Sequence, residues 1–376
     1  MRANRKMLGI MSGALLVVGM AWASTWNQDV AVGAKWSDAG NWSAGVPGTG
    51  DTAIFSQTQA NTYDVDVDVA GTTRLQQVSQ QHVFNGSGSI SVSANPAAHF
   101  QHIMHNTTSG TVTYNVGVGM DTQGSAFWGQ STHLNGGTTV FNNSYTLTSG
   151  SLLNLKDGTH TFNGDLNVAG NLRLDGTVII GGSGTTAISF NYLSTAGTGS
   201  KLYLNRTGAY TVTTPTGYLR IEKTDVHLGA DFAVGAGTDV QMYGGLAGDL
   251  ISDGDYDQNF GTLANGQTTV ADLNLGNSAS TWTFADSSSK TWAAGFNISN
   301  VDAADTVIRF DLGSGSGLTA AQIGQITLNG SVLTTGDTTV DGGYLYITQA
   351  IPEPATLGLV GLVSMGIVVW RRVFAI

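Results

Sequence analysis

The feature that most constrains the fold is a quasi-repeat near the middle of the chain. Residues 136–158 read GGTTVFNNSYTLTSGSLLNLKDG, and residues 157–176 read DGTHTFNGDLNVAGNLRLDG. Each copy runs through a strand, an Asn-containing turn, a strand, a small-residue turn, a third strand and Asp-Gly. The glycines at 137, 158 and 176 recur at a spacing of about 20 residues, which is typical of a solenoid in which one repeat makes one coil.

Apolar and polar residues alternate along both copies, which is the inside–outside pattern of β-strands. Phe141 aligns with Phe162, and Leu155 aligns with Leu174. Three short strands per coil predict an all-β fold, a right-handed parallel β-helix whose inward side chains are buried only by stacking of the coils. Asn-Gly and Asp-Gly are also hairpin turns, so an antiparallel β-sandwich or jelly roll is the alternative. The quasi-repeat favours the solenoid.

The composition is typical of strands joined by many turns. Asp accounts for 24 of the 26 acidic residues, and 52 of the 376 residues are Gly. Asp favours caps and turns, whereas Glu favours helices. The chain has no cysteine, which excludes disulfides and thiolate metal sites. Its formal net charge of −11 argues against a nucleic-acid partner, which would favour a basic patch.

Residues 1–23 are predicted to be a secretory signal peptide. Three basic residues precede an apolar stretch at 7–20, and Ala21 and Ala23 give the small-x-small pattern before a cleavage site. We expect export through the Sec translocon and cleavage by signal peptidase after Ala23. An uncleaved N-terminal anchor is the alternative, but the apolar stretch is short for a membrane span.

The other end of the chain carries a second apolar segment. The stretch from Ala355 to Trp370 carries no charge, and Arg371 and Arg372 follow at once. A spanning helix needs about 17 residues or more, and 355–370 falls just under that limit, so we predict a short transmembrane helix there. The positive-inside rule keeps the two arginines cytoplasmic. Residues 24–350 would then lie outside the inner membrane. A buried core helix is the alternative, but an all-β body offers it no obvious core.

The segment 351–376 resembles a known sorting signal. Pro352, Glu353 and Pro354, followed by the apolar run and the arginine pair, resemble the PEP-CTERM signal of Gram-negative bacteria. The resemblance implies that an exosortase, an integral-membrane cysteine protease, recognises the Pro-Glu-Pro triplet while Arg371 and Arg372 orient the segment. It further implies processing, passage to the cell surface or an extracellular matrix, and association with exopolysaccharide and biofilm. The tail beyond the arginines departs from the family pattern.

These signals divide the chain into five parts: a signal peptide at 1–23, an N-terminal cap at 24–56, a solenoid body at 57–280, C-terminal coils and a cap at 281–350, and the sorting signal at 351–376. The cap resembles the opening of autotransporter-like β-helix passengers through Trp36, Trp42 and the residues around them. We expect both rings to cover the first coil, and a sugar-stacking platform is the alternative role. Residues 318–323 are expected to form one short helical turn.

The strongest local motif for a metal lies in SDGDYDQNFG, where Asp253, Asp255, Asp257 and Asn259 resemble the start of a calcium loop. Gln258 stands where an EF-hand needs Gly, so the motif supports only a looser structural calcium site. No other cofactor is expected.

Two further clusters have weaker claims to a metal. His99, His102 and His105 could bind zinc, but no H-E-x-x-H pattern accompanies them. Asp64, Asp66 and Asp68 alternate with valines, and a solvated strand face is favoured over a calcium site.

The sequence therefore predicts an exported, non-enzymatic surface or matrix protein with no catalytic residues. The alternative is a β-helix protein that binds or cleaves extracellular polysaccharide, which a groove lined by aromatic rings and at least two carboxylates would favour. An adhesin is not separable from the first hypothesis by sequence.

Overall fold

The computed structural model describes residues 23–348 with gaps at 28–33, 49–50, 56–62, 69, 73, 77–81, 86–88, 94–101, 107–110, 122–130, 136, 148–151, 170, 189–192, 196–198, 214–217, 244–247 and 302–304. Three sets of predicted residues lie outside this part of the chain. They are Ala21 of the cleavage site, the transmembrane helix 355–370, and the sorting residues Pro352, Glu353, Pro354, Arg371 and Arg372.

The described chain forms a β-solenoid in which each coil contributes strands to three faces. In one coil, β13 (Thr138–Phe141) lies on the first face, β14 (Tyr145–Leu147) on the second, and the first half of β15 (Leu152–Phe162) on the third. The second half of β15 then returns to the first face and pairs in parallel with β13. Because the backbone repeats this circuit, residues about one period apart in sequence become direct neighbours.

The first face is one parallel ladder. It stacks, in order, β2 (Ala34–Lys35), β4 (Tyr63–Asp66), β7 (His82–Asn85), β10 (Thr111–Tyr114), β13, the second halves of β15 and β17 (Asn171–Ile180), β20 (Ser200–Leu204), β22 (Thr224–Leu228), β24 (Leu250–Ser252), β27 (Ala271–Asn274), β29 (Phe296–Ser299) and β31 (Ile326–Leu328).

The second face stacks β5 (Ala70–Thr72), β8 (Ser89–Ser93), β11 (Gly117–Asp121), β14, β16 (Leu166–Val168) and β18 (Thr186–Ile188), and it continues beyond two isolated bridges with β25 (Gln258–Asn259), β28 (Thr281–Phe284) and β30 (Val307–Asp311).

The third face is made of β1 (Ala23–Thr25), β3 (Thr52–Ile54), β6 (Arg74–Gln76), β9 (His102–Asn106), β12 (Ser131–Asn135), the first halves of β15 and β17, β19 (Leu193–Thr195), β21 (Tyr218–Ile221), β23 (Asp239–Met242) and β26 (Leu263–Asn265).

This parallel pairing confirms the predicted all-β solenoid, and the antiparallel sandwich is wrong for the body. Among the described residues, antiparallel strand pairs occur only at the C-terminal end, and one isolated antiparallel bridge joins Trp26 and Trp42 near the N-terminus. At the C-terminal end, β32 (Ser331–Val332) folds back on β31, and β34 (Tyr344–Ile347) lies between β33 (Thr338–Asp341) and β30. Reversing the chain direction ends the parallel ladder.

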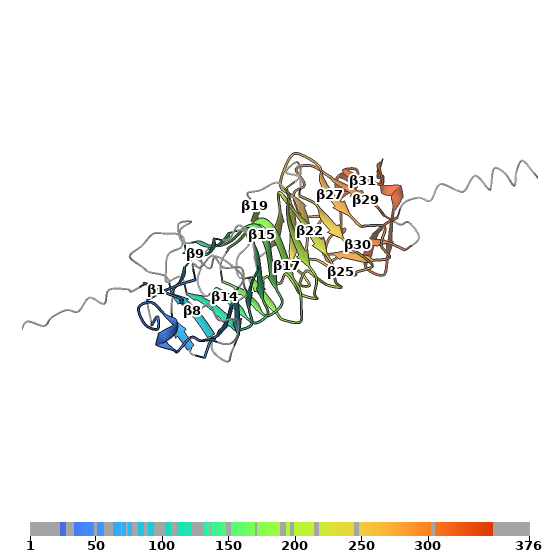
Figure 1. Ribbon diagram of the computed structural model, residues 1–376. Coiled ribbons are helices and arrows are strands. Elements are labelled where there is room, and N and C mark those ends of the chain that lie inside the picture. The colour runs from blue at the N-terminus through green and yellow to red at the C-terminus, as the bar shows by residue number, and fades with distance from the viewer. Residues whose placement is uncertain are drawn as a thin grey trace, which may run out of the picture.

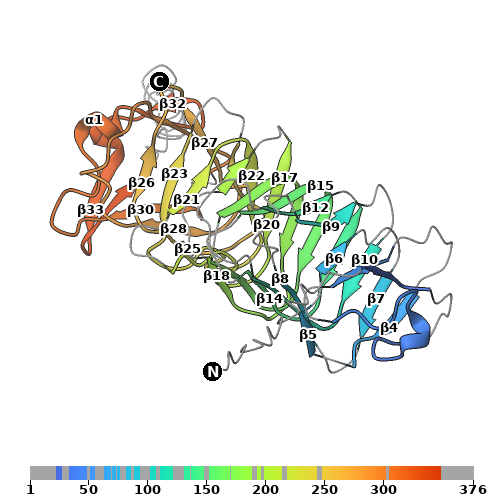
Figure 2. The ribbon, with the colours of Figure 1, turned by 90° about the vertical axis from the view of Figure 1, so that its left-hand side faces the viewer.

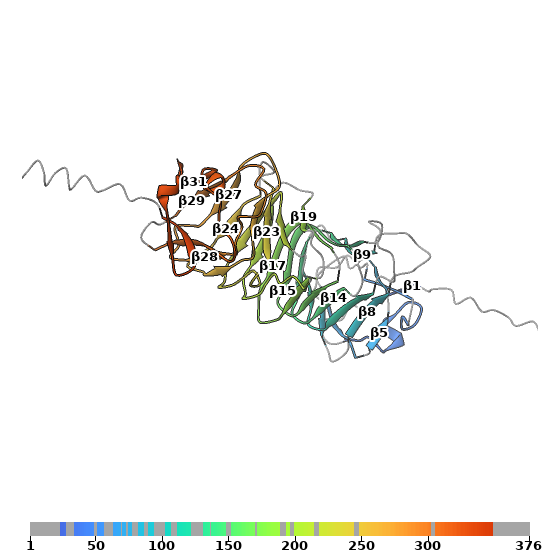
Figure 3. The ribbon, with the colours of Figure 1, turned by 180° about the vertical axis from the view of Figure 1, so that it is seen from behind.

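Helix is nearly absent from the described residues, which contain α1 (Ala320–Ile323) and two 3₁₀ turns, η1 (Ala39–Asn41) and η2 (Thr335–Asp337). The expected helical turn is therefore confirmed at α1, which begins after the capping residue Thr319. Colour runs from blue to red along the long axis because each coil is added to the end of the previous one (Figures 1 and 3). Figure 2 shows α1 and β33 at one end and β4 and β7 at the other.

The core is a set of side-chain columns that run parallel to the solenoid axis. Tyr114, Phe141 and Phe162 occupy the same inward position on successive coils, and their rings stack with centroids 4.9 and 5.0 Å apart. The strand register produces these columns, because β13 pairs Phe141 with both neighbours. Stacked rings at this spacing add about 0.5–1.5 kcal/mol per pair beyond the area they bury.

The recurring glycines of the quasi-repeat lie where the chain turns from the third face to the first: Gly137 between β12 and β13, Gly158 in β15 and Gly176 in β17. Gly158 has φ of +77°, a left-handed conformation that costs Gly little. A Cβ atom on Gly176 would lie 2.9 Å from the carbonyl oxygen of Gly158. The recurrence of these glycines therefore reflects one backbone turn stacked closely on the next.

The aromatic residues near the N-terminus form a closed cluster. Trp26, Trp36, Trp42 and Phe55 are buried, and Trp42 Nε1 donates a hydrogen bond of 2.8 Å to the Trp36 carbonyl oxygen. The sugar-stacking interpretation of Trp36 and Trp42 is wrong because these residues are only 2% and 4% exposed. The division into a cap at 24–56, a body and C-terminal coils stays a prediction, and the third face runs through the first boundary from β3 to β6.

Candidate functional site

Polar side chains at the turn between the first and second faces, which we name the first corner, join the coils together. Asn142 Nδ2 donates to Asn115 Oδ1, and Asn163 Nδ2 donates to Asn142 Oδ1, both at 2.8 Å. An amide has both a donor and an acceptor, so identical residues on stacked coils form a continuous ladder. The same motif recurs farther along, where Asn300 donates to Asn274.

Aspartates at the first corner accept hydrogen bonds from the next coil. Asp165 Oδ1 accepts from the Thr185 backbone N–H at 2.7 Å, and Asp231 Oδ1 accepts from the Asp257 N–H at 2.8 Å. The hydrogen bonds from Thr185 hold the pKa of Asp165 below its ordinary value, because they favour the charged carboxylate. The shorter Asp side chain suits this contact, which gives a physical reason for the excess of Asp over Glu.

Arg206 donates several hydrogen bonds at the first corner. It is 6% exposed, and its terminal nitrogens donate to the carbonyl oxygens of Gly164, Gly181 and Thr185 at 2.9, 2.7 and 3.0 Å. It also donates to Thr186 Oγ1 at 2.6 Å. These acceptors belong to the two preceding coils, so one guanidinium joins three coils.

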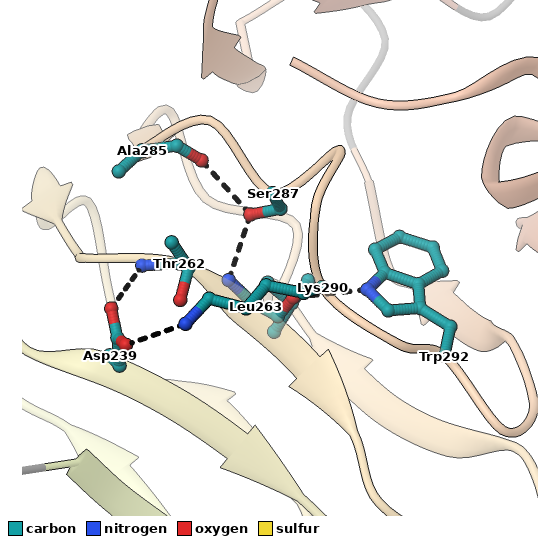
Figure 4. Close-up of polar contacts among 7 residues, drawn as sticks. All are labelled: Asp239, Thr262, Leu263, Ala285, Ser287, Lys290 and Trp292. Atoms are coloured by element: carbon teal, nitrogen blue, oxygen red, sulfur yellow. Dashed lines mark hydrogen bonds and ion pairs between the residues drawn. The ribbon is translucent and has the colours of Figure 1, made fainter. Parts of the chain in front are cut away.

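The corner between the second and third faces has a similar network (Figure 4). Asp239 accepts from the Thr262 N–H at 2.7 Å and pairs with Lys290 Nζ at 3.2 Å. Ser287 Oγ accepts from the Leu263 N–H at 2.9 Å. Trp292 Nε1 donates to the Leu263 carbonyl oxygen at 3.0 Å. The polar groups of this network hold the coils to one another.

The predicted calcium residues lie after β24 and in β25, and hydrogen bonds between coils engage three of them. Asp253 Oδ1 lies 2.8 Å from His227 Nδ1. The carboxylates of Asp255 and Asp257 accept backbone N–H groups of the next coil at 2.8 and 2.6 Å. Asn259 pairs through its backbone in β25. In the described ranges, no three His, Asp or Glu side chains form a metal-binding group, and structural calcium stays a prediction.

The other two predicted clusters are only partly described. His99 lies outside the described residues, whereas His102 and His105 belong to β9, where a register shift falls between their pairing positions. Val65 and Val67 are buried while Asp66 and Asp68 are half-buried, which confirms the predicted alternation there.

Asp68 connects the N-terminal cap to the first coils. Its carboxylate accepts from the Ser37 hydroxyl at 2.6 Å and from the Ser37 N–H at 2.9 Å. The hydroxyl hydrogen bond is the main cause that lowers the pKa of Asp68. This aspartate therefore acts as a structural link rather than as part of a uniform solvated row.

Three aspartates form a row on the outer surface of the first face. Asp225, Asp249 and Asp272 occupy successive coils, because Val226 pairs with Leu250 and Leu250 pairs with Leu273. Partial burial, and then repulsion from Asp272 and Asp225, raises the pKa of Asp249. Sequence reasoning missed this row because each of its members belongs to a different coil, so that no sequence motif contains two of them.

Sequence reasoning also missed a groove on the outer surface of the second face. It has a volume of about 550 Å³ and lies across β25, β28 and β30, with Tyr344 of β34 at one side. Phe232, Asp257, Asn259, Arg309 and Asp311 are among its lining residues. Aromatic rings, two carboxylates and a guanidinium thus meet from five separate coil segments, which no local motif could reveal.

The C-terminal segment beyond the last strand supplies the link to known proteins. Residues 350–373 match the family model of the PEP-CTERM protein-sorting motif. This motif indicates an exported protein that is sorted by an exosortase and held in the membrane by its C-terminal tail before processing. No curated protein and no solved structure matches the chain significantly. Membrane-spanning length and hydrophobicity are not met by any helix in the part of the chain that the structure describes.

Proposed function

We propose that this protein is an exported, non-enzymatic rod that an exosortase delivers to the cell surface or an extracellular matrix, where it associates with exopolysaccharide and biofilm. The observation that carries the proposal is the order of its parts. A β-solenoid ends at β34, and the PEP-CTERM motif follows closely, at 350–373. The solenoid is then the exported part of the protein, and the C-terminal tail is its sorting signal. Its coils wind right-handed, as nearly all parallel crossovers do.

The chemistry of the tail suits this role. Pro352 and Pro354 disfavour helix in the residues that precede them, so the segment presents an extended backbone to a protease. The apolar run that follows holds the chain in the inner membrane after export through the Sec translocon, and the arginines keep its end cytoplasmic.

The polar groups of the solenoid support a structural rather than a catalytic role. The carboxylates of Asp165, Asp231 and Asp239 each accept a backbone N–H from the following coil. Side chains used in this way stabilise a rod and keep its coils in register. Excluding residues 1–23 and 351–376 leaves 10 basic and 25 acidic residues, a net charge of −15 that favours solubility outside the cell.

The test is the C-terminal mass of the mature chain, measured in cells with and without an exosortase. We expect the tail to be absent only in exosortase-positive cells, and the double variant Pro352→Ala/Pro354→Ala to keep it. Val340→Ala is the matched control, because this exposed β33 residue lies near the tail but outside the motif. An intact wild-type tail in exosortase-positive cells would refute the sorting proposal.

Polysaccharide recognition is the second candidate, and the groove on the second face favours it. Incubating the exported chain with exopolysaccharide and measuring new reducing ends separates binding from cleavage. We expect co-sedimentation with the polysaccharide and no release of reducing ends, and release that is lost in Asp257→Asn would instead establish an enzyme.

A further inference from the structure

The groove on the second face has one aromatic ring that is held outward by an unusual backbone. Phe232 is 44% exposed and has φ of +49°, a left-handed conformation that costs a residue with a bulky side chain about 1–2 kcal/mol. Its N–H donates to the Asp257 carbonyl oxygen at 2.7 Å, and its carbonyl oxygen accepts from the Gly208 N–H at 2.8 Å. The ladder on both sides therefore determines where this ring lies, and glycine would fit the same backbone without strain.

A second ring lines the groove about four strand spacings away, roughly 19 Å along the solenoid axis. The guanidinium of Arg309 lies 4.3 Å from the centre of the Tyr344 ring, and Arg309 Nε donates to Thr283 Oγ1 at 3.0 Å. Both contacts hold the guanidinium plane in place. Among the described residues, its two terminal nitrogens make no hydrogen bond, so they remain available as donors.

The groove also offers acceptors. Asp257 uses Oδ1 to accept from the Thr281 N–H at 2.6 Å, and Asp311 uses Oδ1 to accept from the Gly313 N–H at 2.9 Å. The second oxygen of each carboxylate is not used in these bonds, and both residues are exposed. Donors and acceptors that are already positioned lose little entropy on binding.

These features match one class of ligand. A sugar ring has apolar C–H faces that pack on aromatic rings, and hydroxyl groups that both donate and accept hydrogen bonds. The two carboxylates outnumber the single guanidinium, and the exported body has a net charge of −15, from 10 basic and 25 acidic residues. Both facts disfavour an anionic polysaccharide as the ligand. The volume of about 550 Å³ is in the range of small-molecule sites.

We propose that this groove binds a neutral oligosaccharide segment. Phe232 and the Tyr344 ring face that Arg309 does not cover are its two stacking surfaces, and Arg309, Asp257 and Asp311 are its hydrogen-bonding groups. The proposal rests on the proposed extracellular association with polysaccharide and identifies its binding site and ligand class. It does not depend on exosortase processing.

The test is binding of the full chain, purified in detergent, to an array of neutral hexose and N-acetylhexosamine oligomers, with alginate and hyaluronan oligomers as anionic probes. The tightest neutral probe is then titrated by calorimetry. We expect neutral oligomers to bind, and affinity to increase from disaccharide to tetrasaccharide because the two rings are well separated. An array on which only anionic probes bind, or none, overturns the proposal and leaves the C-terminal mass result unaffected.

Phe232→Gly separates binding from folding. This substitution removes the ring and relieves the backbone strain, so we expect affinity to fall by at least 10-fold while the unfolding midpoint stays equal or rises. Tyr344→Ala should lower affinity by a similar factor. The control Val270→Ala alters a residue that is 50% exposed and does not line the groove, and it should change neither quantity. Unchanged affinity in both aromatic variants would contradict the proposed site.

Discussion

The first corner and the outer surfaces of the faces use the same residue types in opposite ways. At the corner, Asp165 and Arg206 are bonded to backbone groups of neighbouring coils. On the outer surfaces, Asp249 is repelled by two other carboxylates, and the terminal nitrogens of Arg309 beside the groove bond to no residue that the structure describes. The difference teaches that polar side chains at the corner mainly join the coils, whereas those on an outer surface can keep groups available for a ligand. Asp257 has both roles, because its carboxylate accepts from the next coil and the residue also lines the groove.

Substitution of Arg206 should give the largest difference in stability between the corner and the outer surfaces. Arg206→Met keeps much of the apolar stem but removes the donor shared by the Gly164 and Gly181 carbonyl oxygens, which should lower the free energy of unfolding by about 2–3 kcal/mol. The control is Arg173→Met on the outer surface of the third face, where the ion pair with Asp175 is partly exposed at 3.5 Å. A surface pair contributes only about 0–1 kcal/mol. Equal losses in chemical denaturation would remove the distinction between corner and face.

His160 should make the turn between the third and first faces sensitive to mild acid. It is fully buried where β15 bends, and Nε2 contacts the carbonyl oxygens of Lys156 and Asp157 at 3.3 and 3.1 Å. Burial lowers the pKa of His160 below its ordinary value of 6.5. The unfolded chain therefore binds the extra proton first, and stability should fall as the pH drops below about 6.5.

The measurement is the unfolding free energy of wild type and His160→Val between pH 8 and pH 5. Valine is the chosen substitute because Val178 occupies the same position on the next coil. We expect the slope below pH 6.5 to be shallower in the variant. An identical slope in the two proteins would assign the acid sensitivity to other groups.

A matched pair of Asp→Asn substitutions gives the smallest and most discriminating effects. The lowered pKa of Asp165 means that its carboxylate stabilises the fold above its ordinary pKa of 3.8, and this contribution is lost as the pH falls through the folded-state value. The raised pKa of Asp249 has the opposite effect on stability, because the charged Asp249 carboxylate destabilises the fold at pH values above its folded-state pKa. Asp165→Asn should therefore lower stability at pH 7, and Asp249→Asn should raise it by less than about 1 kcal/mol.

Thermal unfolding at pH 7 and near pH 3 tests this pair. Both differences should shrink in acid, where protonation makes each carboxyl resemble the amide that replaces it. Changes of the same sign at pH 7 would show that position around the coil does not set the role of an aspartate.

Several features of the fold were predictable because they depend on local spacing. The regular recurrence of Gly137, Gly158 and Gly176 predicted stacked coils, and the structure explains it by a left-handed turn and a close backbone approach. The alternation around Val65 and Val67 predicted which side chains are buried. The antiparallel end at β33 and β34 was not predicted, because a hairpin and a coil turn have the same short-range residue preferences.

The candidate site could not be predicted in the same way. Arg309 and Thr283 are hydrogen-bonded although they are 26 residues apart in sequence. The aspartates of SDGDYDQNFG read as one calcium loop, but each of Asp253, Asp255 and Asp257 bonds to a different residue on a neighbouring coil. A short stretch of sequence shows only neighbours along the chain. The residues that meet on one face of a solenoid come from different coils, about one period or more apart in sequence.

The sequence by itself determined two things: a body of short strands stacked in a regular repeat, and a C-terminal segment that matches a sorting motif at 350–373. Both patterns consist of residues that are close together in sequence, so they can be recognised without the tertiary structure. Only the tertiary structure decided that Phe232, Arg309 and Tyr344 line one groove and that Trp36 and Trp42 are buried. The physical reason is that coil length varies along the rod, so the register between distant residues is known only once the strands are paired.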